Sequence, residues 1–370
     1  MAAMSIFDRK PALRWVAPLA FVAVVGGTTG IVATATAKDA LTPISAEDLL
    51  TRMQQAEVDT FSGTVVQNSN LGIPDLPGLT SSDGASLSSL ISGTHTLGVW
   101  YAGPDKARLQ IQGTNDETDV IVNGKDVWNW SYKDNTATHR TLTAPSRDGS
   151  DKRTGSGLDL PKTPQDAAEQ ALDALQPTTE VSTDGTATVA GIDAYELVLT
   201  PKDAGSLVTQ VRIAVDGTKF IPLRVQVIAG QPKPAFEVAY TAIDFDKPDD
   251  DQFTFKAPPG AKVTEVAPRS GSADNAPSKK EIEKHSQAAE DTKVVGQGWS
   301  SVVVSELDLE DADESSGQLG QVLGSLPKVS GDWGSGRLLS GTVFSAVLTD
   351  DGRVAVGSVR PEVLYDALAK

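Results

Sequence analysis

Residues 119–132 read DVIVNGKDVWNWSY, and this stretch carries the strongest local fold signal in the chain. A β-branched run leads directly into Asn123-Gly124. An Asn-Gly pair flanked by apolar runs favours the tight turn of an antiparallel hairpin, because both residues accept a positive φ. In the returning run Trp128, Trp130 and Tyr132 occupy alternate positions, so they share one face of the strand. The stretch therefore predicts a β-hairpin.

Alternation of apolar and polar residues continues on both sides of this hairpin. It predicts further strands over residues 61–66, 94–101, 107–111, 194–199, 208–215, 221–228 and 236–245. Turns such as Asp216-Gly217 and Ala229-Gly230 leave only short connections, and short connections join antiparallel neighbours. The predicted fold class is mainly β (α+β), with a curved antiparallel sheet.

Two helices are predicted among the strands. The first spans residues 44–56, where Ser45 is the N-cap and Asp48 follows at the spacing of a capping box. The second begins at Thr163-Pro164, because threonine is a good N-cap and proline suits the first helical position.

The length of 370 residues suggests about two folded domains. Pro268, Gly271 and Pro277 give residues 264–280 the composition of a linker. We therefore predict a main domain over residues 41–265, a linker over 266–292 and a small C-terminal α+β domain over 293–370.

The N-terminus predicts export. Arg9, Lys10 and Arg14 precede an apolar run, and Ala35-Thr36-Ala37 matches a signal-peptidase site. Residues 1–37 are either a cleaved signal peptide or, since the uncharged run is about long enough to span a bilayer, a retained membrane anchor. Both alternatives place the remainder outside the cytoplasm, on the extracytoplasmic face of the membrane or in a periplasm-like space.

Composition argues against several function classes. The net charge is -17 with no basic stripe after the N-terminus, whereas nucleic-acid binding needs clustered Lys and Arg. The absence of cysteine removes thiolate metal sites and cysteine nucleophiles.

Residues that could carry catalysis are scattered. The histidines His95, His139 and His285 form no H-E-x-x-H pattern, and no G-x-S-x-G elbow occurs. Carboxylates gather at 249–251 and 308–314, but the second group lacks the glycine and final glutamate of an EF-hand. We predict no catalytic residue, no metal and no cofactor, and rank a hydrolase last among three hypotheses.

Two features leave alternatives open. Residues 70–93 combine loop residues with recurring apolar side chains, so they form either a flap that uses Leu87, Leu90 and Ile91, or a short amphipathic helix on the core. Trp128 and Trp130 are either ordinary core or the wall of a ligand site.

An ordered set of motifs resembles the LolA-like superfamily, which includes LolA lipoprotein carriers and the N-terminal domain of RseB/MucB regulators. The resemblance covers about residues 41–265. Its motifs are Phe61-x-Gly63-Thr64-Val65-Val66, Gly98-Val99-Trp100-Tyr101-x-x-Pro104, the run 119–128, Thr163-Pro164 and Phe253-x-Phe255-x-x-Pro258-Pro259-Gly260.

The resemblance implies an unclosed antiparallel β half-barrel with helices on its concave side, where acyl chains bind. Gly103 stands where carriers place an arginine that latches the helical lid, which argues against a shuttling carrier. The side chains expected to line the hydrophobic cavity are Leu97, Val99, Ile111, Trp128, Trp130, Leu197, Leu199, Leu223 and Val225.

The first function hypothesis is a non-enzymatic envelope protein that binds a lipid or an acylated lipoprotein. The second is an RseB-like regulator that senses envelope signals and binds a membrane protein partner such as an anti-sigma factor. Neither binds nucleic acid, and both associate with the membrane through the N-terminal segment.

Overall fold

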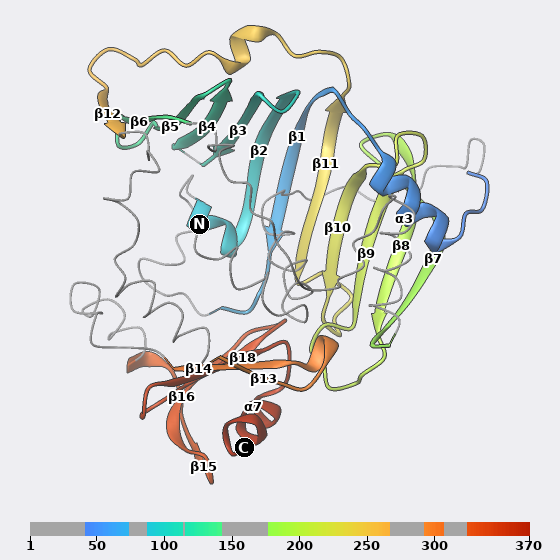
Figure 1. The fold of residues 1–370 in the computed structure, drawn as a ribbon, viewed down its shortest axis with the longest axis vertical. Helices are drawn as coiled ribbons and strands as arrows, with labels where there is room; N and C mark the ends of the chain where they lie inside the picture. The colour runs from blue at the N-terminus through green and yellow to red at the C-terminus, as the bar shows by residue number, and fades with distance from the viewer. Residues whose placement is uncertain (1–40, 74–86, 114, 143–176, 267–291, 307–323) are drawn as a thin grey trace, which may run out of the picture.

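The computed structural model describes residues 41–73, 87–113, 115–142, 177–266, 292–306 and 324–370. Twelve strands in these ranges form one open, mainly antiparallel sheet in the order β12-β6-β5-β4-β3-β2-β1-β11-β10-β9-β8-β7 (Figure 1). The strands are β1 (Thr60–Ser69), β2 (Gly93–Ala102), β3 (Lys106–Gln112), β4 (Glu117–Asn123), β5 (Asp126–Ser131), β6 (Thr136–Thr141), β7 (Thr179–Val189), β8 (Ile192–Pro201), β9 (Gln210–Asp216), β10 (Pro222–Ile228), β11 (Phe236–Asp244) and β12 (Lys262–Val266). The predicted fold class is confirmed.

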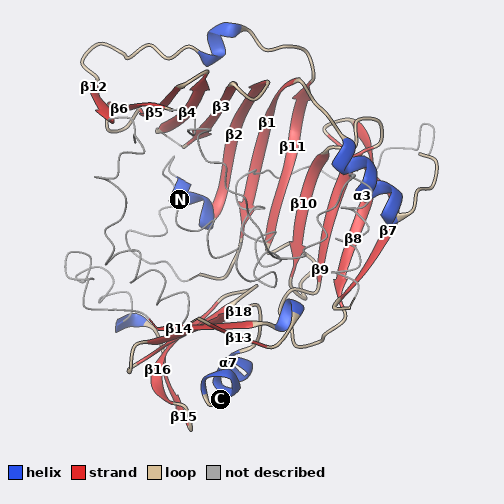
Figure 2. Cartoon of the chain, viewed as in Figure 1, coloured by secondary structure: helices blue, strands red, loops and turns tan. Residues whose placement is uncertain are grey.

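A second, smaller sheet follows in the order β13-β14-β18-β17-β16-β15, and Figure 2 shows it beside the large sheet. Its strands are β13 (Lys293–Val295), β14 (Val302–Glu306), β15 (Lys328–Gly331), β16 (Gly334–Ser340), β17 (Ser345–Thr349) and β18 (Arg353–Gly357). The described helices are α3 (Ala46–Gln55), α7 (Pro361–Leu368) and the short 3-10 helices η3 (Leu87–Ile91), η4 (Asp250–Phe253) and η6 (Gly298–Ser300).

The local sequence signals form the predicted structures, except that the turn of one hairpin is shifted by one residue. Ser45 caps α3: its hydroxyl accepts from the Asp48 amide at 3.0 Å and donates to the Asp48 carboxylate at 2.9 Å, so the predicted N-cap is confirmed. In the β4–β5 hairpin, Asn123 pairs with Asp126. The two-residue turn is therefore Gly124-Lys125, one position after Asn123-Gly124, and Gly124 takes the positive φ of +61°.

Strand β12 departs from the antiparallel pattern. After β11 the chain passes over one end of the large sheet and returns as β12, which pairs in parallel with β6 (Figure 1). Parallel pairing is available here because the long connection allows the chain to come back in the same direction. Phe253 in η4 is 1% exposed, so this connection is anchored to the sheet.

Register divides the large sheet into two faces. Val65 of β1 pairs with Leu97 of β2 and with Tyr240 of β11, so these three residues lie on one side. The same side includes Val225 of β10, which pairs with Ile213 of β9, and Ile213 pairs with Leu197 of β8. Because it also carries α3 and η3, we call it the helical face, and the other side the opposite face.

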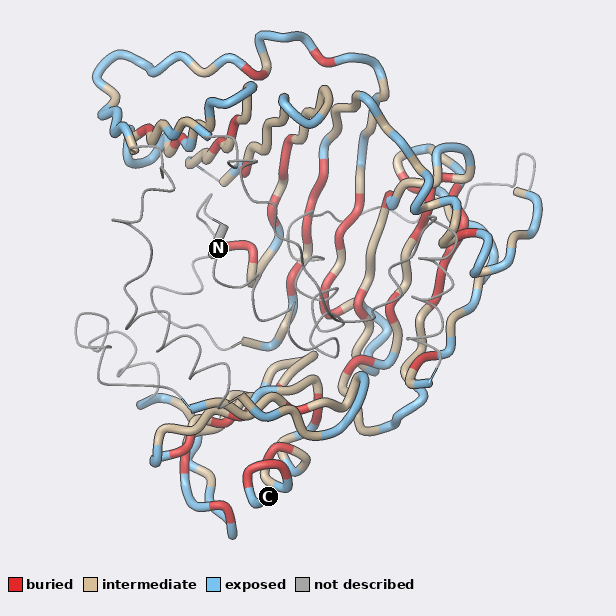
Figure 3. The backbone as a smooth tube through the Cα atoms, in the orientation of Figure 1, coloured by how far each residue is buried: buried red, intermediate tan, exposed pale blue. Residues whose placement is uncertain are grey.

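The main core lies on the helical face. Leu49 of α3 is fully buried against Tyr195, Leu197 and Val215. Figure 3 shows buried stretches along the central and right-hand strands, whereas much of the β11–β12 connection is exposed. Burying this apolar face removes a large nonpolar area from water and so stabilises the fold.

The small sheet is joined to the helical face. The Leu207 amide donates to the Ser358 carbonyl at 2.8 Å, and the Thr342 amide donates to the Leu71 carbonyl. Trp299 and Val343 pack against the apolar ends of β9, β10 and β11. Gly72 makes a close approach: its φ is +68°, and a Cβ there would lie 2.6 Å from the Thr342 hydroxyl.

Several predictions fall on residues outside the described ranges. These are the export segment 1–37, the helix beginning at Thr163-Pro164 and nearly all of the linker 266–292. Among the helices that the structure describes, none is long and apolar enough to cross a membrane.

We expect the substitution Leu49→Ala to lower the free energy of unfolding by about 2–5 kcal/mol, because it leaves a cavity between α3 and the sheet. Urea denaturation of the purified protein measures the change. The control Gln55→Ala alters an exposed position of the same helix and should change stability by less than about 0.5 kcal/mol. Equal effects of the two substitutions would show that α3 does not depend on this contact.

Candidate binding face of the large sheet

The helix η3 covers the lower end of the helical face. Leu90 is 8% exposed and packs into a cluster with Val65, Leu97 and Ile111. Below it, the Gln67 side-chain amide donates to the Leu90 carbonyl, and the Ser69 hydroxyl donates to the Ile91 carbonyl at 2.9 Å. The segment is therefore fixed on the core by both an apolar contact and side-chain hydrogen bonds. Within the segment 70–93, residues 87–91 form this short 3-10 helix, which also contains Leu87, while residues 74–86 lie outside the described ranges.

A half-exposed apolar strip extends from this cluster across the neighbouring strands. Its members share the helical face by register and are neither fully buried nor fully exposed; they are Val99, Leu109, Val120, Val122 and Val127. We call them the apolar strip. A surface of this kind, next to a closed apolar cluster, can take up a further apolar group.

Aromatic side chains border the apolar strip on the β1 side. The Phe61 ring lies 5.4 Å from Tyr101 and 6.5 Å from Tyr240, centroid to centroid. Burial raises the pKa of Tyr240 to about 12, which reports an apolar environment around its ring and hydroxyl.

Most of the predicted cavity residues lie on the helical face. Leu97 and Ile111 are fully buried under η3, and Leu90 contacts both. Leu197 is buried beneath α3, while Leu199 and Val225 belong to the apolar area near the small sheet. Leu223 lies at the register shift between Pro222 and Arg224 and is 1% exposed. Val99 is the member of the predicted set that also belongs to the apolar strip.

Trp128 and Trp130 lie on the opposite face. Trp128 pairs with Ile121 and Trp130 with Asp119, positions that alternate with those of Val120 and Val122. Phe255 covers both indoles, with ring centroids 4.8 and 5.7 Å away, and His139 stacks on Trp128 at 4.1 Å. The structure therefore does not bring the two tryptophans together with Leu97, although the sequence grouped them; Trp130 is buried and Trp128 is partly buried.

Sequence reasoning missed Leu109, Val120, Val122 and Val127. The sequence favoured Trp128 and Trp130, the largest side chains of β5, and these lie on the opposite face. Neighbouring residues of a strand point to opposite faces, so a choice that is wrong by one residue selects the wrong face. The hairpin signal could have identified the strip, because a two-residue turn pairs Val122 with Val127.

The opposite face is polar between β8 and β10. Glu196 is 7% exposed and accepts from Arg212 at 2.5 Å and from Arg224 at 2.6 Å. The hydrogen bond with Glu196 is the largest cause that raises the pKa of Arg212 above its ordinary value. This charged network makes that area unsuitable for an apolar ligand.

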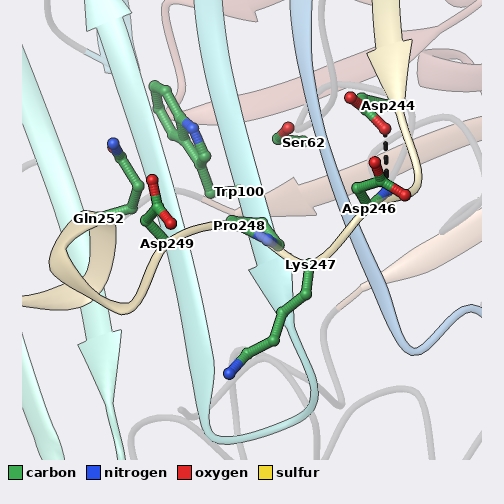
Figure 4. Close-up of a pocket in the computed structure, with 8 residues that line it drawn as sticks. All are labelled: Ser62, Trp100, Asp244, Asp246, Lys247, Pro248, Asp249 and Gln252. Carbon is green, nitrogen blue, oxygen red and sulfur yellow. Dashed lines mark hydrogen bonds between the residues drawn. The ribbon is translucent and has the colours of Figure 1, made fainter.

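An open hollow of about 230 Å³ lies farther along the opposite face, at the start of the β11–β12 connection (Figure 4). Trp100 and Pro248 provide its apolar surface, and Asp244, Asp246 and Asp249 lie around it. The hollow is small and polar, so it does not suit an acyl chain. Within the described residues, no group of three histidine, aspartate or glutamate side chains is placed to hold a metal ion.

His139 links the edge strand β12 to the hairpin β5–β6. Its Nδ1 lies 2.8 Å from the Glu265 carboxylate and its Nε2 lies 2.9 Å from Asp126. Desolvation lowers the pKa of His139, but the hydrogen bonds with Asp126 and then Glu265 outweigh it and raise the pKa above its ordinary value.

The chain belongs to the family described as predicted periplasmic protein (DUF2092), whose model matches residues 82–267, just over half of the sequence. The matched region includes most of the large sheet and its apolar strip. The predicted extracytoplasmic location is confirmed by this family. No curated protein matches the chain.

Solved structures similar to this chain include MucB and LolA-superfamily proteins, the groups that the sequence motifs resemble. The Pseudomonas aeruginosa MucA/MucB complex shares 16% identity with a TM-score of 0.44, covering 87% of this chain and 96% of that one. A LolA superfamily protein from Nitrosomonas europaea shares 14% identity with a TM-score of 0.20, covering 58% and 99%. A putative outer membrane lipoprotein-sorting protein domain from Vibrio parahaemolyticus shares 12% with a TM-score of 0.22, covering 56% and 95%. At these scores the functions of the neighbours do not transfer to this chain.

We expect stability to fall as the pH rises through the pKa of His139. A raised folded pKa means that protonation stabilises the folded state; this contribution is fully present below the unfolded value of about 6.5 and is lost above the folded value. Neutral imidazole donates only one hydrogen bond, so one carboxylate then faces a lone pair. Urea denaturation across this pH range should show a smaller decline in the free energy of unfolding for His139→Gln than for the unmodified protein. An NMR titration that places His139 at or below its ordinary pKa would contradict the prediction.

Proposed function

We propose that this protein is a non-enzymatic lipid- or lipoprotein-binding protein of the cell envelope, which holds acyl chains on the helical face of the large sheet. The observation that carries the proposal is the apolar strip, which stays half-exposed beside a closed apolar cluster. The described histidines favour a structural role, since His95 is buried with Nε2 2.8 Å from the Ser92 carbonyl and His139 lies between two carboxylates.

The energetics favour an acyl ligand. Burying a methylene group gains roughly 0.8 kcal/mol, so affinity grows with chain length and requires no catalytic group. Val99, Leu109, Val120 and Val127 offer side chains that are apolar and lie on four adjacent strands. In this proposal the residues predicted from the sequence form the packed floor and flanks of the site; they are Leu97, Ile111, Leu197, Leu199 and Val225. The helix η3, with Leu90 and Ile91, borders the site.

A second candidate function is regulation through a membrane protein partner such as an anti-sigma factor. The observation that favours it is the firm junction of the two sheets at Leu207–Ser358 and Leu71–Thr342, which would let one sheet report a change in the other. In this view residues 41–265 and 293–370 are separate domains joined by 266–292. Residues 1–37 would keep the protein at the membrane, or direct its export, in both candidates.

Native mass spectrometry tests the proposal on the full chain, exported with its own N-terminal segment in a host that supplies lipids. A bound mass that dissociates as a lipid on activation supports the proposal and gives the ligand class. Protein that carries no lipid, and takes up none after incubation with long-chain fatty acid or acylated peptide, would overturn it and favour the regulator.

We expect Val99→Asp to weaken binding of a fluorescent long-chain fatty acid by about tenfold or more, because it places a charge in the apolar strip. The control is Val263→Asp, which makes the same change at a 45% exposed position on edge strand β12. Circular dichroism verifies that both variants are folded. Equal affinities of the two variants would place the ligand elsewhere.

A further inference from the structure

A row of apolar residues crosses the small sheet on the face without α7. Each member lies directly opposite the next on the neighbouring strand: Val294 pairs with Val303, Val303 with Val356, Val356 with Ala346, and Ala346 with Leu339. We call these five residues the valine row. It runs over β13, β14, β18, β17 and β16 without a polar residue.

The valine row is not buried. Val356 is 39% exposed, and the other four members are half-buried. The alternate positions differ sharply: Val302, Val347 and Ala355 are at most 1% exposed and form one core with Leu364 and Leu368 of α7. One face of the small sheet thus packs against α7, while the other face carries an apolar row that is partly exposed.

The small sheet that carries the valine row is joined to the helical face. The small sheet is attached through Trp299 and Val343 to the helical face, not to the opposite face. Figure 1 shows α7 on the side of the small sheet turned away from the large sheet. The valine row therefore faces the side where the helical face carries η3 and the apolar strip.

We propose that the valine row is the second wall of the lipid site, so that an acyl chain lies between the two sheets. This inference rests on the proposed function and assigns a specific role to the small sheet. Five strands about 4.8 Å apart give the row a length of roughly 19 Å. An acyl chain in one leaflet of a bilayer spans about 15 Å, half of the hydrocarbon thickness, so the row can accommodate it lengthwise.

The edge of the row supplies charge for a head group. Lys328 pairs with Arg337, and Arg337 pairs with Leu348 on the same face as the valine row. The Arg337 guanidinium is held by the carbonyls of Gly324 and Leu326 at 2.9 Å. Two cations at the end of an apolar row, in a protein of net charge -17, favour an acyl chain with an anionic head group.

Photo-crosslinking tests the second wall on the full chain, with a long-chain fatty acid that carries a diazirine. Peptide mapping of the unmodified protein should find cross-links on β14 or β18 in addition to the large sheet. In parallel, Val356→Asp should weaken fatty-acid binding about tenfold, while the matched control Val263→Asp leaves it unchanged. Because Val356 is exposed, the variant is expected to fold, and thermal melting verifies this.

The outcomes separate the two proposals. Cross-links on the small sheet together with weaker binding by Val356→Asp support the second wall. Cross-links confined to the large sheet, with Val356→Asp binding like the unmodified protein and Val99→Asp impaired, overturn the second wall and leave the proposed function intact. No fatty-acid binding by the unmodified protein overturns both.

Discussion

The apolar helical face of the large sheet is the constraint on which the rest of the structure depends. A closed barrel buries such a face against itself, but this sheet stays open between its edge strands β12 and β7. The face must therefore be covered by other parts of the chain. Leu49 of α3, Leu90 of η3, and Trp299 and Val343 of the small-sheet region each cover one area of it.

This cover is uneven, and the unevenness connects the fold with the proposed function. Beneath α3 and at the junction with the small sheet, side chains such as Leu197 and Val211 are closely packed. Across β2 to β5 the apolar strip keeps part of its surface accessible. The opposite face differs in chemistry, since Glu196 with its two arginines occupies one area and Phe255 closes another. An apolar ligand thus has one suitable face.

Much of the fold could be predicted from local patterns. The N-cap at Ser45, the alternation in β2, β3 and β8 to β11, and the hairpin near Asn123-Gly124 are short-range signals, and each forms its element. The parallel pairing of β12 with β6 could not be predicted, because residues 262–266 carry no signal that specifies a partner about 126 positions away, as in Glu265–His139. Of the residues predicted for the candidate site, Leu97, Val99 and Ile111 lie on the helical face, whereas Trp128 and Trp130 do not.

The sequence by itself predicted export and determined that the chain is rich in antiparallel strands with a broad apolar sheet face, because targeting signals and alternation are patterns of neighbouring residues. Only the tertiary structure decided which side of β5 joins that face, since side chains of one strand alternate and a single step in register exchanges them. It also decided that the small sheet is fixed to the helical face and that the valine row lies on the face turned away from α7. Those outcomes arise from contacts between segments far apart in the chain, such as Leu71 with Thr342, and no local pattern contains them.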